Sequence, residues 1–172
     1  GMGPVFQGFF GMVPSSLKKK YPEARLLEQG VWNSLQRPPV LDPADPLFEQ
    51  MAKVWYAEYE KLFGKGNLFG GDLFHEGGKT GGIDVTDAAR RVQTAMKQYN
   101  PDAVWVIQAW LGNPKKELLA GLDRKNTLIV DLAAEFWDNW RTRKGLAGFL
   151  WLSWNISNYG GNIGLHGGLV AT

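Results

Sequence analysis

The chain alternates between continuous apolar runs and segments with helical periodicity. Five apolar runs are evident, at Gly3 to Phe10, Asn67 to Phe74, Ala103 to Trp110, Thr127 to Leu132 and Leu146 to Trp154. Because polar residues do not alternate with apolar ones in the longer runs, they predict strands of a parallel sheet that is covered on both faces.

Helical signals separate the predicted strands. A helix is expected to begin at Asp45-Pro46, because apolar residues recur at helical spacing from there to Leu62. Further helices are predicted after Pro14, at about Thr86 to Tyr99, at Pro114 to Leu122 and at Phe136 to Lys144. The segment from Tyr21 to Pro46 holds five prolines and is expected to be irregular. Loops of that length in compact domains usually carry function.

Strands alternating with helices predict an α/β fold with a parallel sheet. About five strands are predicted, whereas a closed (β/α)₈ barrel needs eight strands and roughly 250 residues. The 172 residues are therefore expected to form a single domain. It is either a smaller open α/β domain or a partial barrel.

Composition limits the possible binding partners more than it limits the possible folds. The net charge of +2 supplies no strong field for nucleic acid, and no apolar segment has the length of a membrane span. The amino terminus carries no signal-peptide pattern. With no cysteine and two histidines, His75 and His166, we expect neither a metal site nor a cofactor.

The candidate chemistry lies where the predicted strands end. Glu76 follows the run Asn67 to Phe74 and precedes Gly77-Gly78. The four tips are Phe74-His75-Glu76, Gln108-Ala109-Trp110, Asp131-Leu132 with Glu135 just after it, and Trp154-Asn155. Because parallel strands carry their carboxyl ends to one edge, these tips are expected to share one pocket. A carboxylate among aromatic side chains favours a hydrolase that acts on a carbohydrate.

Several segments together resemble the α-N-acetylglucosaminidases of glycoside hydrolase family 89. They are Gly8 to Ser16, Gly30-Val31-Trp32, Leu41 to Phe48, Asp72 to Gly77, Ala103 to Trp110, Leu128 to Glu135 and Asn158 to Gly167. The segments occur in the family's order and cover nearly the whole chain. The resemblance implies a partial (β/α)₈ TIM barrel, with about five parallel strands and flanking helices.

The resemblance also implies an activity and a site. The family removes terminal non-reducing α-linked N-acetylglucosamine with retention, which requires two carboxylates about 5–5.5 Å apart. It implies that Glu76 is the acid/base and that Trp32 and Trp110 line the sugar pocket. His75, which precedes Glu76, is expected to bind the sugar through a hydrogen bond from its imidazole. Leu132 and Ile156 match pocket residues more weakly. The implied partner is an N-acetylglucosamine-terminated glycan, and the implied location is secreted, periplasmic or lysosomal.

Two departures from the family pattern bear on activity. His75 stands where many members carry Asn just before the acid/base. The family's nucleophile glutamate lies roughly thirty residues beyond Gly160-Gly161-Asn162, so we expect residues 1–172 to be an incomplete barrel fragment with little or no turnover. Its exposed sheet edges are expected to pair with another copy. A non-catalytic carbohydrate-binding or structural fragment remains an alternative.

Overall fold

The computed structural model describes residues 3–74, 78–134 and 148–154 of the chain. Its main sheet has five strands, β1 (Val5–Gln7), β6 (Leu68–Gly70), β7 (Val104–Ala109), β8 (Thr127–Leu132) and β9 (Leu150–Trp154). The strands lie side by side in chain order, and each neighbouring pair is parallel. Parallel strands in chain order are the arrangement of one part of a (β/α)₈ barrel.

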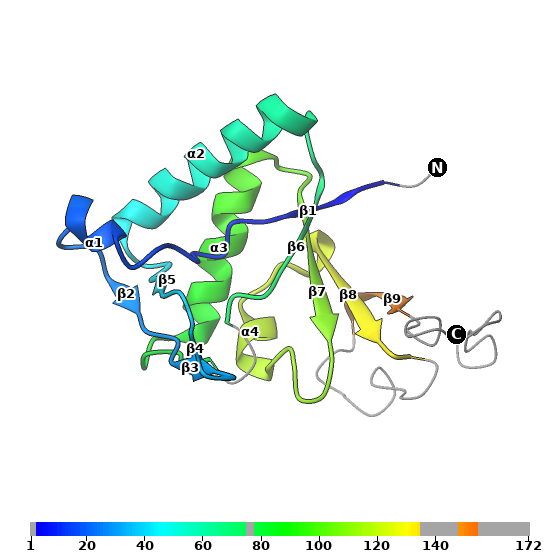
Figure 1. Cartoon of the computed structure of the whole chain (residues 1–172). Helices are drawn as coiled ribbons and strands as arrows, with labels where there is room; N and C mark the ends of the chain where they lie inside the picture. The colour runs from blue at the N-terminus through cyan, green and yellow to red at the C-terminus, as the bar shows by residue number, and fades with distance from the viewer. Residues whose placement is uncertain (1–2, 75–77, 135–147, 155–172) are drawn as a thin grey trace.

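Helices connect the strands (Figure 1). They are α1 (Leu17–Lys20), α2 (Pro46–Phe63), α3 (Val85–Tyr99), α4 (Lys116–Ala120) and the short 3-10 helix η1 (Arg124–Asn126). The two long helices begin at aspartates whose carboxylates accept backbone N–H groups. Asp45 accepts from the N–H of Leu47, and Asp84 accepts from those of Thr86 and Asp87. No helix among the described residues is long and apolar enough to cross a membrane.

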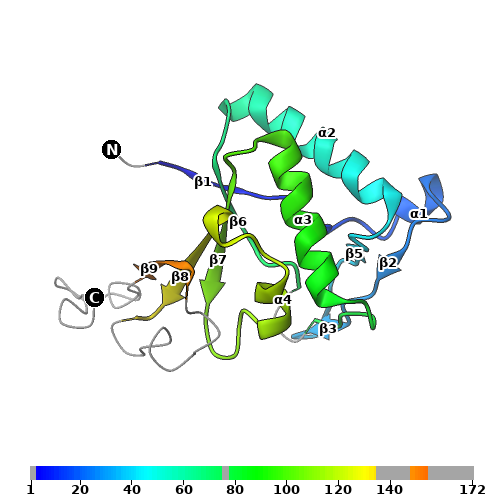
Figure 2. The same ribbon diagram turned by 180° about the vertical axis from the view of Figure 1, so that it is seen from behind.

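One face of the sheet packs against the helices and forms the core. Phe69, Trp105 and Ile129 point to this side and are at most 1% exposed. In Figure 2, α3 and α4 lie to the right of β7, and β8 and β9 lie to its left. The indole Nε1 of Trp105 donates to the carbonyl of Gly71 at 2.9 Å, so its polar group is satisfied within the core.

The other face is concave and lines a hollow of about 700 Å³. Val106 and Val130, on the central strands, are buried there, whereas Val5 on β1 and Leu152 on β9 are 52% and 54% exposed. On this face, side chains of the central strands are therefore buried, and side chains of the two outer strands are exposed. The predicted pairing of these edges with another copy stays a prediction, which light scattering tests.

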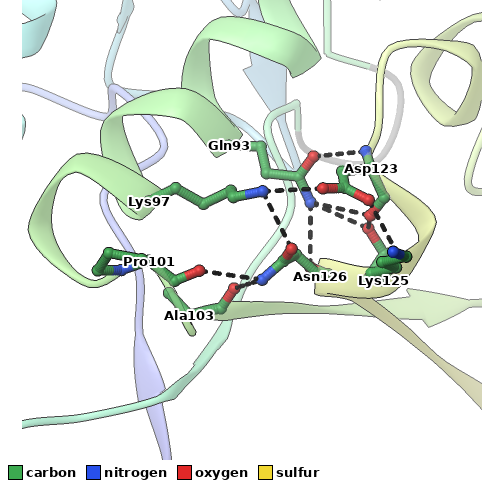
Figure 3. A network of polar contacts seen from close by, with 8 residues as sticks. Gln93, Lys97, Pro101, Ala103, Asp123, Lys125 and Asn126 are labelled. Atoms are coloured by element: carbon green, nitrogen blue, oxygen red, sulfur yellow. Dashed lines mark hydrogen bonds and ion pairs between the residues drawn. The ribbon is translucent and has the colours of Figure 1, made fainter.

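The amino-terminal edge of the sheet is held by side-chain amides (Figure 3). Nε2 of Gln93, on α3, donates to the carbonyl of Asn126 and to Oγ1 of Thr127, both at 3.0 Å. Nδ2 of Asn126 donates to the carbonyl of Ala103 at 2.8 Å, and Asn100 reaches the carbonyl of Gly66 in the same way at 2.9 Å. Each partner lies just before a strand or, as Thr127 does, begins one, so these amides fix where β6, β7 and β8 begin.

The strand bounds differ from the predicted ones. β6 stops at Gly70 rather than continuing to Phe74, because Gly71 has φ +142° and turns the chain away from the sheet. The first strand is Val5–Gln7, within the predicted run from Gly3 to Phe10. The predicted helix from Phe136 to Lys144 lies outside the described residues.

The segment from Tyr21 to Pro46 was predicted to be irregular, but it forms two small antiparallel ribbons. β2 (Leu26–Leu27) pairs with β5 (Val40–Leu41), and β3 (Val31–Trp32) pairs with β4 (Leu35–Gln36). Each strand has only two residues, too few for an alternating pattern to be visible in the sequence.

Candidate active site

The carboxyl-terminal edge of the sheet carries the described ends of the strands that were predicted to form the site. In Figure 1 the arrowheads of β7 and β8 point to the end of the molecule where β3 and β4 also lie. Asp72 follows β6, Trp110 follows β7 and Ala133 follows β8. The structure therefore brings the ends of these strands to one edge, as the parallel topology requires.

The backbone at this edge adopts left-handed conformations that residues other than glycine rarely take. Leu111 and Ala133, just beyond β7 and β8, have φ of +45° and +59°. The N–H of Trp110 donates to the carbonyl of Asn113 at 3.1 Å, and the N–H of Asn113 donates back at 2.8 Å. Trp110 is thus held at the base of a tight loop, half-buried. Strained backbone of this kind concentrates at functional sites.

Trp32 lies on the β3–β4 hairpin and is 51% exposed. The turn residues Asn33 and Ser34 have φ of +47° and +65°, which matches the twist of a two-residue hairpin turn. An indole that exposes half of its surface contributes little to a core, but it offers a flat apolar face to a ligand.

The base of this hairpin is tied to the loop after β1. The N–H of Leu41 donates to the carbonyl of Gly11 at 2.7 Å, and the N–H of Val13 donates to the carbonyl of Pro39 at 3.1 Å. An alanine Cβ at Gly11 would lie 2.7 Å from the carbonyl oxygen of Leu41, so only glycine permits this approach. The ribbon of β2 and β5 therefore holds the hairpin beside the main sheet.

The end of β8 separates two residues that were predicted to face one pocket. Leu132 has the same parity as Leu128 and Val130, so it points toward the concave face and is half-buried there. Asp131 has the opposite parity and is 1% exposed on the helix-facing side. Placing Asp131 at the rim of the pocket was therefore wrong. The prediction assumed that all residues at the end of a strand face the same pocket, whereas successive side chains of a strand point to opposite faces of the sheet.

Two further predicted tips lie partly or wholly outside the described residues. Glu76, His75, Glu135 and Ile156 have no described position. The described neighbours of Glu76 are Phe74, which packs against the core, and Gly78. The roles of Glu76, His75 and Ile156 stay predictions.

The concave face presents polar groups that received no role in the sequence analysis. Gln7 and Asp72 line the hollow together with Gln108. A signal for Gln7 was present, because it is the only polar side chain in the run from Gly3 to Phe10. Amide groups on an otherwise apolar concave surface can donate to and accept from hydroxyl groups of a ligand.

Charge at this edge is sparse within the described residues. No group of three or more His, Asp or Glu side chains among them could hold a metal ion. A group with a shifted pKa is Tyr56 on α2, whose hydroxyl oxygen accepts the N–H of Phe9 at 3.2 Å, just after β1. Burial raises the pKa of Tyr56 to about 12, so this hydroxyl stays protonated at neutral pH.

Comparison with known proteins identifies the fold and its family. The family model "Alpha-N-acetylglucosaminidase (NAGLU) tim-barrel domain" matches residues 1–172. The chain belongs to this family. The resemblance found in the sequence and the predicted partial barrel are thereby confirmed.

Relatives of this α-N-acetylglucosaminidase family domain are similar over most of the chain. Human alpha-N-acetylglucosaminidase is 29% identical over 188 aligned residues, which include 99% of this chain and 25% of the human protein. This chain therefore spans about a quarter of the length of that relative.

Solved structures of a family 89 glycoside hydrolase from Clostridium perfringens show the same fold. The complex with 2-acetamido-1,2-dideoxynojirimycin has a TM-score of 0.75 and 40% identity, covering 78% of this chain and 16% of the other. The complex with PUGNAc has a TM-score of 0.78 and 37% identity, covering 88% of this chain and 18% of the other. A form of the clostridial enzyme with two glutamates replaced by glutamine was solved with its substrate, GlcNAc-alpha-1,4-galactose.

Family membership indicates which role the carboxyl-terminal edge of the sheet has. Active sites of (β/α)₈ barrels lie at that edge, built from the loops that follow the strands. In this α-N-acetylglucosaminidase family domain, the strained loops after β7 and β8 and the exposed Trp32 all lie there. The amino-terminal edge carries the satisfied amide network instead.

Proposed function

We propose that this chain forms part of the catalytic barrel of a glycoside hydrolase that removes terminal α-linked N-acetylglucosamine with retention of configuration. The observation that carries the proposal is the match to the tim-barrel family over all 172 residues. The clostridial relative supports it, since that enzyme was solved with a GlcNAc-alpha-1,4-galactose substrate. Export from the cell or delivery to a lysosome, implied by the resemblance, stays a prediction.

In this proposal Glu76 is the acid/base. It protonates the glycosidic oxygen as the bond to the leaving group breaks, and it then takes a proton from the water that attacks the glycosyl-enzyme. The nucleophile is a second carboxylate on the opposite side of the anomeric carbon. Asp131 does not meet this requirement, because it points to the helix-facing side of the sheet and is buried there.

The sugar contacts in this proposal come from the two indoles and the concave face. Trp32 exposes half of its surface, and Trp110 is held half-buried at the end of β7. Their apolar rings can stack on the C–H groups of a pyranose, and Gln108 can hydrogen-bond its hydroxyls. Apolar walls of this kind also raise the pKa of a carboxylic acid, as a general acid requires.

Comparing substrates with different leaving groups tests whether Glu76 is the acid/base. Because residues 1–172 alone are expected to turn over little or not at all, the test uses a protein that carries this chain within a complete barrel, where we expect Glu76→Gln to slow hydrolysis of GlcNAc-α-1,4-galactose on the order of 100-fold or more. The first step of nitrophenyl α-N-acetylglucosaminide cleavage should lose much less, because nitrophenolate leaves with little protonation. The matched control is Glu117→Gln, an exposed glutamate on α4, which should leave both rates unchanged.

Other outcomes would contradict parts of the proposal. The anomer released first, followed by proton NMR, should be α, and a β product would exclude retention. Equal losses on both substrates would argue against an acid role. Sugar binding that is unaffected by Glu76→Gln, in a protein that hydrolyses neither substrate, would favour the non-catalytic carbohydrate-binding alternative.

A further inference from the structure

Gln29 is a buried polar side chain that the proposed chemistry does not use. It is 1% exposed and lies three positions before Trp32, between β2 and β3. Its Nε2 donates to the carbonyl of Lys79 at 2.8 Å and to the carbonyl of Leu27 at 3.2 Å. A buried amide that serves two carbonyls is costly to remove, because both acceptors then lose their donor.

The bond from Gln29 to Lys79 joins two segments that are 50 positions apart. One is the segment between β2 and β3, which leads into the Trp32 hairpin, residues 31–36. The other is the β6–α3 loop, residues 71–84, described at 71–74 and 78–84. In the sequence Lys79 follows Glu76 by three positions. The bond therefore connects the segment that leads into the Trp32 hairpin to the loop in which Glu76 occurs.

Apolar contacts accompany this bond. An alanine Cβ at Gly81 would lie 2.8 Å from Cδ2 of Leu27, so Leu27 packs directly on the loop backbone. The position of a Cβ at Gly30 lies 3.8 Å from Cε of Lys79, so the lysine stem passes over the neck of the hairpin. The two segments thus meet at several points, with the amide of Gln29 among them.

Burial of its own side chains does little to orient the Trp32 hairpin. Val31, Trp32 and Leu35 are between 51% and 68% exposed, so the hairpin has no core of its own among the described residues. Its neck is closed by Gly30, whose carbonyl accepts the N–H of Arg37 at 3.0 Å and Nε2 of Gln36 at 3.2 Å. An isolated two-stranded hairpin is marginally stable in water, so its position depends on contacts at its base.

We propose that Gln29 is a positioning residue that holds the Trp32 hairpin against the β6–α3 loop, fixing the indole in place for sugar binding. The structural part stands on the contacts above, and the consequence for sugar binding rests on the proposed function. Oε1 of Gln29 is buried and has no hydrogen-bond partner among the described residues. The tether is therefore carried by Nε2, which donates to both carbonyls.

The first test compares two glutamines of the same segment. Gln29→Leu removes the bond between the hairpin and the loop, whereas Gln36→Leu removes bonds that stay within the hairpin neck. We expect Gln29→Leu to speed hydrogen exchange of the Arg37 and Ile83 amides about tenfold, which is the loss of one net hydrogen bond. Gln36→Leu should leave the Ile83 amide unchanged. Equal exchange at Ile83 in both variants would overturn the proposal.

The second test approaches the same contact from the loop and does not depend on a buried substitution. Gly81 and Gly82 both have left-handed backbones, with φ of +64° and +77°, but only Gly81 faces Leu27, and a Cβ at Gly82 meets nothing within 4 Å. Gly81→Ala should therefore speed exchange of the Arg37 amide in the hairpin neck, and Gly82→Ala should not. If the two alanine variants behave alike, the contact does not position the hairpin.

A third measurement separates this proposal from the proposed function. Binding of 2-acetamido-1,2-dideoxynojirimycin, followed by calorimetry, should weaken about five- to tenfold in Gln29→Leu and Gly81→Ala and stay unchanged in Gly82→Ala. Faster exchange without weaker binding would overturn the positioning role. A native chain that binds no sugar mimic would contradict the proposed function, while the exchange measurements would still decide whether Gln29 tethers the hairpin.

Discussion

The two edges of the sheet are built in opposite ways. At the amino-terminal edge, side-chain amides of Gln93, Asn100 and Asn126 satisfy the carbonyl groups that precede the strands. At the carboxyl-terminal edge, the described non-glycine residues with positive φ gather, namely Asn33, Ser34, Leu111 and Ala133. Side-chain hydrogen bonds thus hold the first edge, whereas left-handed backbone and the half-exposed Trp32 lie at the second.

The difference indicates that the two edges of the partial barrel have different roles. Hydrogen bonds at the amino-terminal edge fix the start of each strand, and the packed helix-facing side holds the strands in place. The loops after the strands are then free to adopt strained conformations without unfolding the sheet. Substitutions at the amino-terminal edge should change stability, and those at the carboxyl-terminal edge should change ligand binding.

The largest loss of stability is expected from Gln93→Leu. Gln93 is 3% exposed and donates to Asn126 and Thr127, while its Oε1 accepts the N–H of Asp123 at 2.7 Å. Removing the amide leaves several buried polar groups without partners, so the free energy of unfolding should fall by about 3 kcal/mol. Urea denaturation measures this, and sugar affinity of the folded protein should not change.

The matched control is Gln98→Leu on the same helix. Gln98 is exposed, so the expected change is within about 0.5 kcal/mol. If Gln93→Leu were no more destabilising than Gln98→Leu, the amide network would not be what stabilises the amino-terminal edge.

Gly71→Ala should be nearly as destabilising, although it lies at the opposite edge. A Cβ at Gly71 would lie 2.4 Å from Cε2 of Phe10, and φ there is +142°. Moving Phe10 also disturbs its contact with Trp105, whose ring centroid is 5.0 Å away. Overpacking with backbone strain should cost about 2–3 kcal/mol.

Gly64→Ala tests the cost of left-handed backbone without the steric clash with Phe10 that Gly71→Ala introduces. Gly64 ends α2 with φ +78°, and a Cβ there meets nothing within 4 Å. Its substitution should cost about 1 kcal/mol. Equal losses in the two alanine variants would show that Phe10 does not fix the start of the β6–α3 loop.

Trp32→Ala should affect binding without affecting stability. The indole is half exposed and lies outside the core, so the free energy of unfolding should change by less than about 0.5 kcal/mol. Affinity for an N-acetylglucosaminide, measured by calorimetry, should fall about tenfold, since one stacking surface is lost. Val31→Ala removes an apolar side chain that is 63% exposed on the other side of the hairpin and should leave affinity unchanged. Similar losses in both would indicate a general effect of the hairpin.

The sequence predicted the elements that depend on local signals. The helix start at Asp45-Pro46 was recognisable because an aspartate and a proline precede a periodic apolar segment, and the helix predicted at about Thr86 to Tyr99 begins within a residue of that position, at Val85. The buried strand at Thr127–Leu132 was found with its observed bounds, since its continuous apolar run reflects packing on both faces.

Features that depend on distant contacts were not predictable in this way. β6 ends at Gly70 because Phe10 and Trp105 pack around Gly71, and neither is near it in the sequence. The bond between Gln29 and Lys79 likewise joins residues 50 positions apart. Asp131 was misplaced because a carboxylate at the end of a strand gives no indication of which face it points to until the register is known.

The smallest expected effect concerns the ion pair at the amino-terminal edge. Nζ of Lys97 lies 2.8 Å from Oδ2 of Asp123, on the protein surface. The hydrogen bond from Lys97 and that from the N–H of Lys125 hold the pKa of Asp123 below its usual range. A carboxyl whose pKa is lowered by folding stabilises the protein above its unfolded pKa, about 3.9, and loses this contribution as pH falls through the folded value. Asp123→Asn should therefore reduce the free energy of unfolding by about 0.5 kcal/mol at pH 7 and by progressively less below about pH 4.

Urea denaturation at several pH values checks this dependence. Asp102→Asn is the control, because the carboxylate of Asp102 forms no ion pair within the described part of the chain. Molar salt should halve the effect of Asp123→Asn or reduce it further, since exposed ion pairs are screened. A loss that is constant from pH 7 to pH 3 would mean that Asp123 acts through the geometry of the turn before β8. The amino-terminal edge would then owe its stability to neutral amide hydrogen bonds alone.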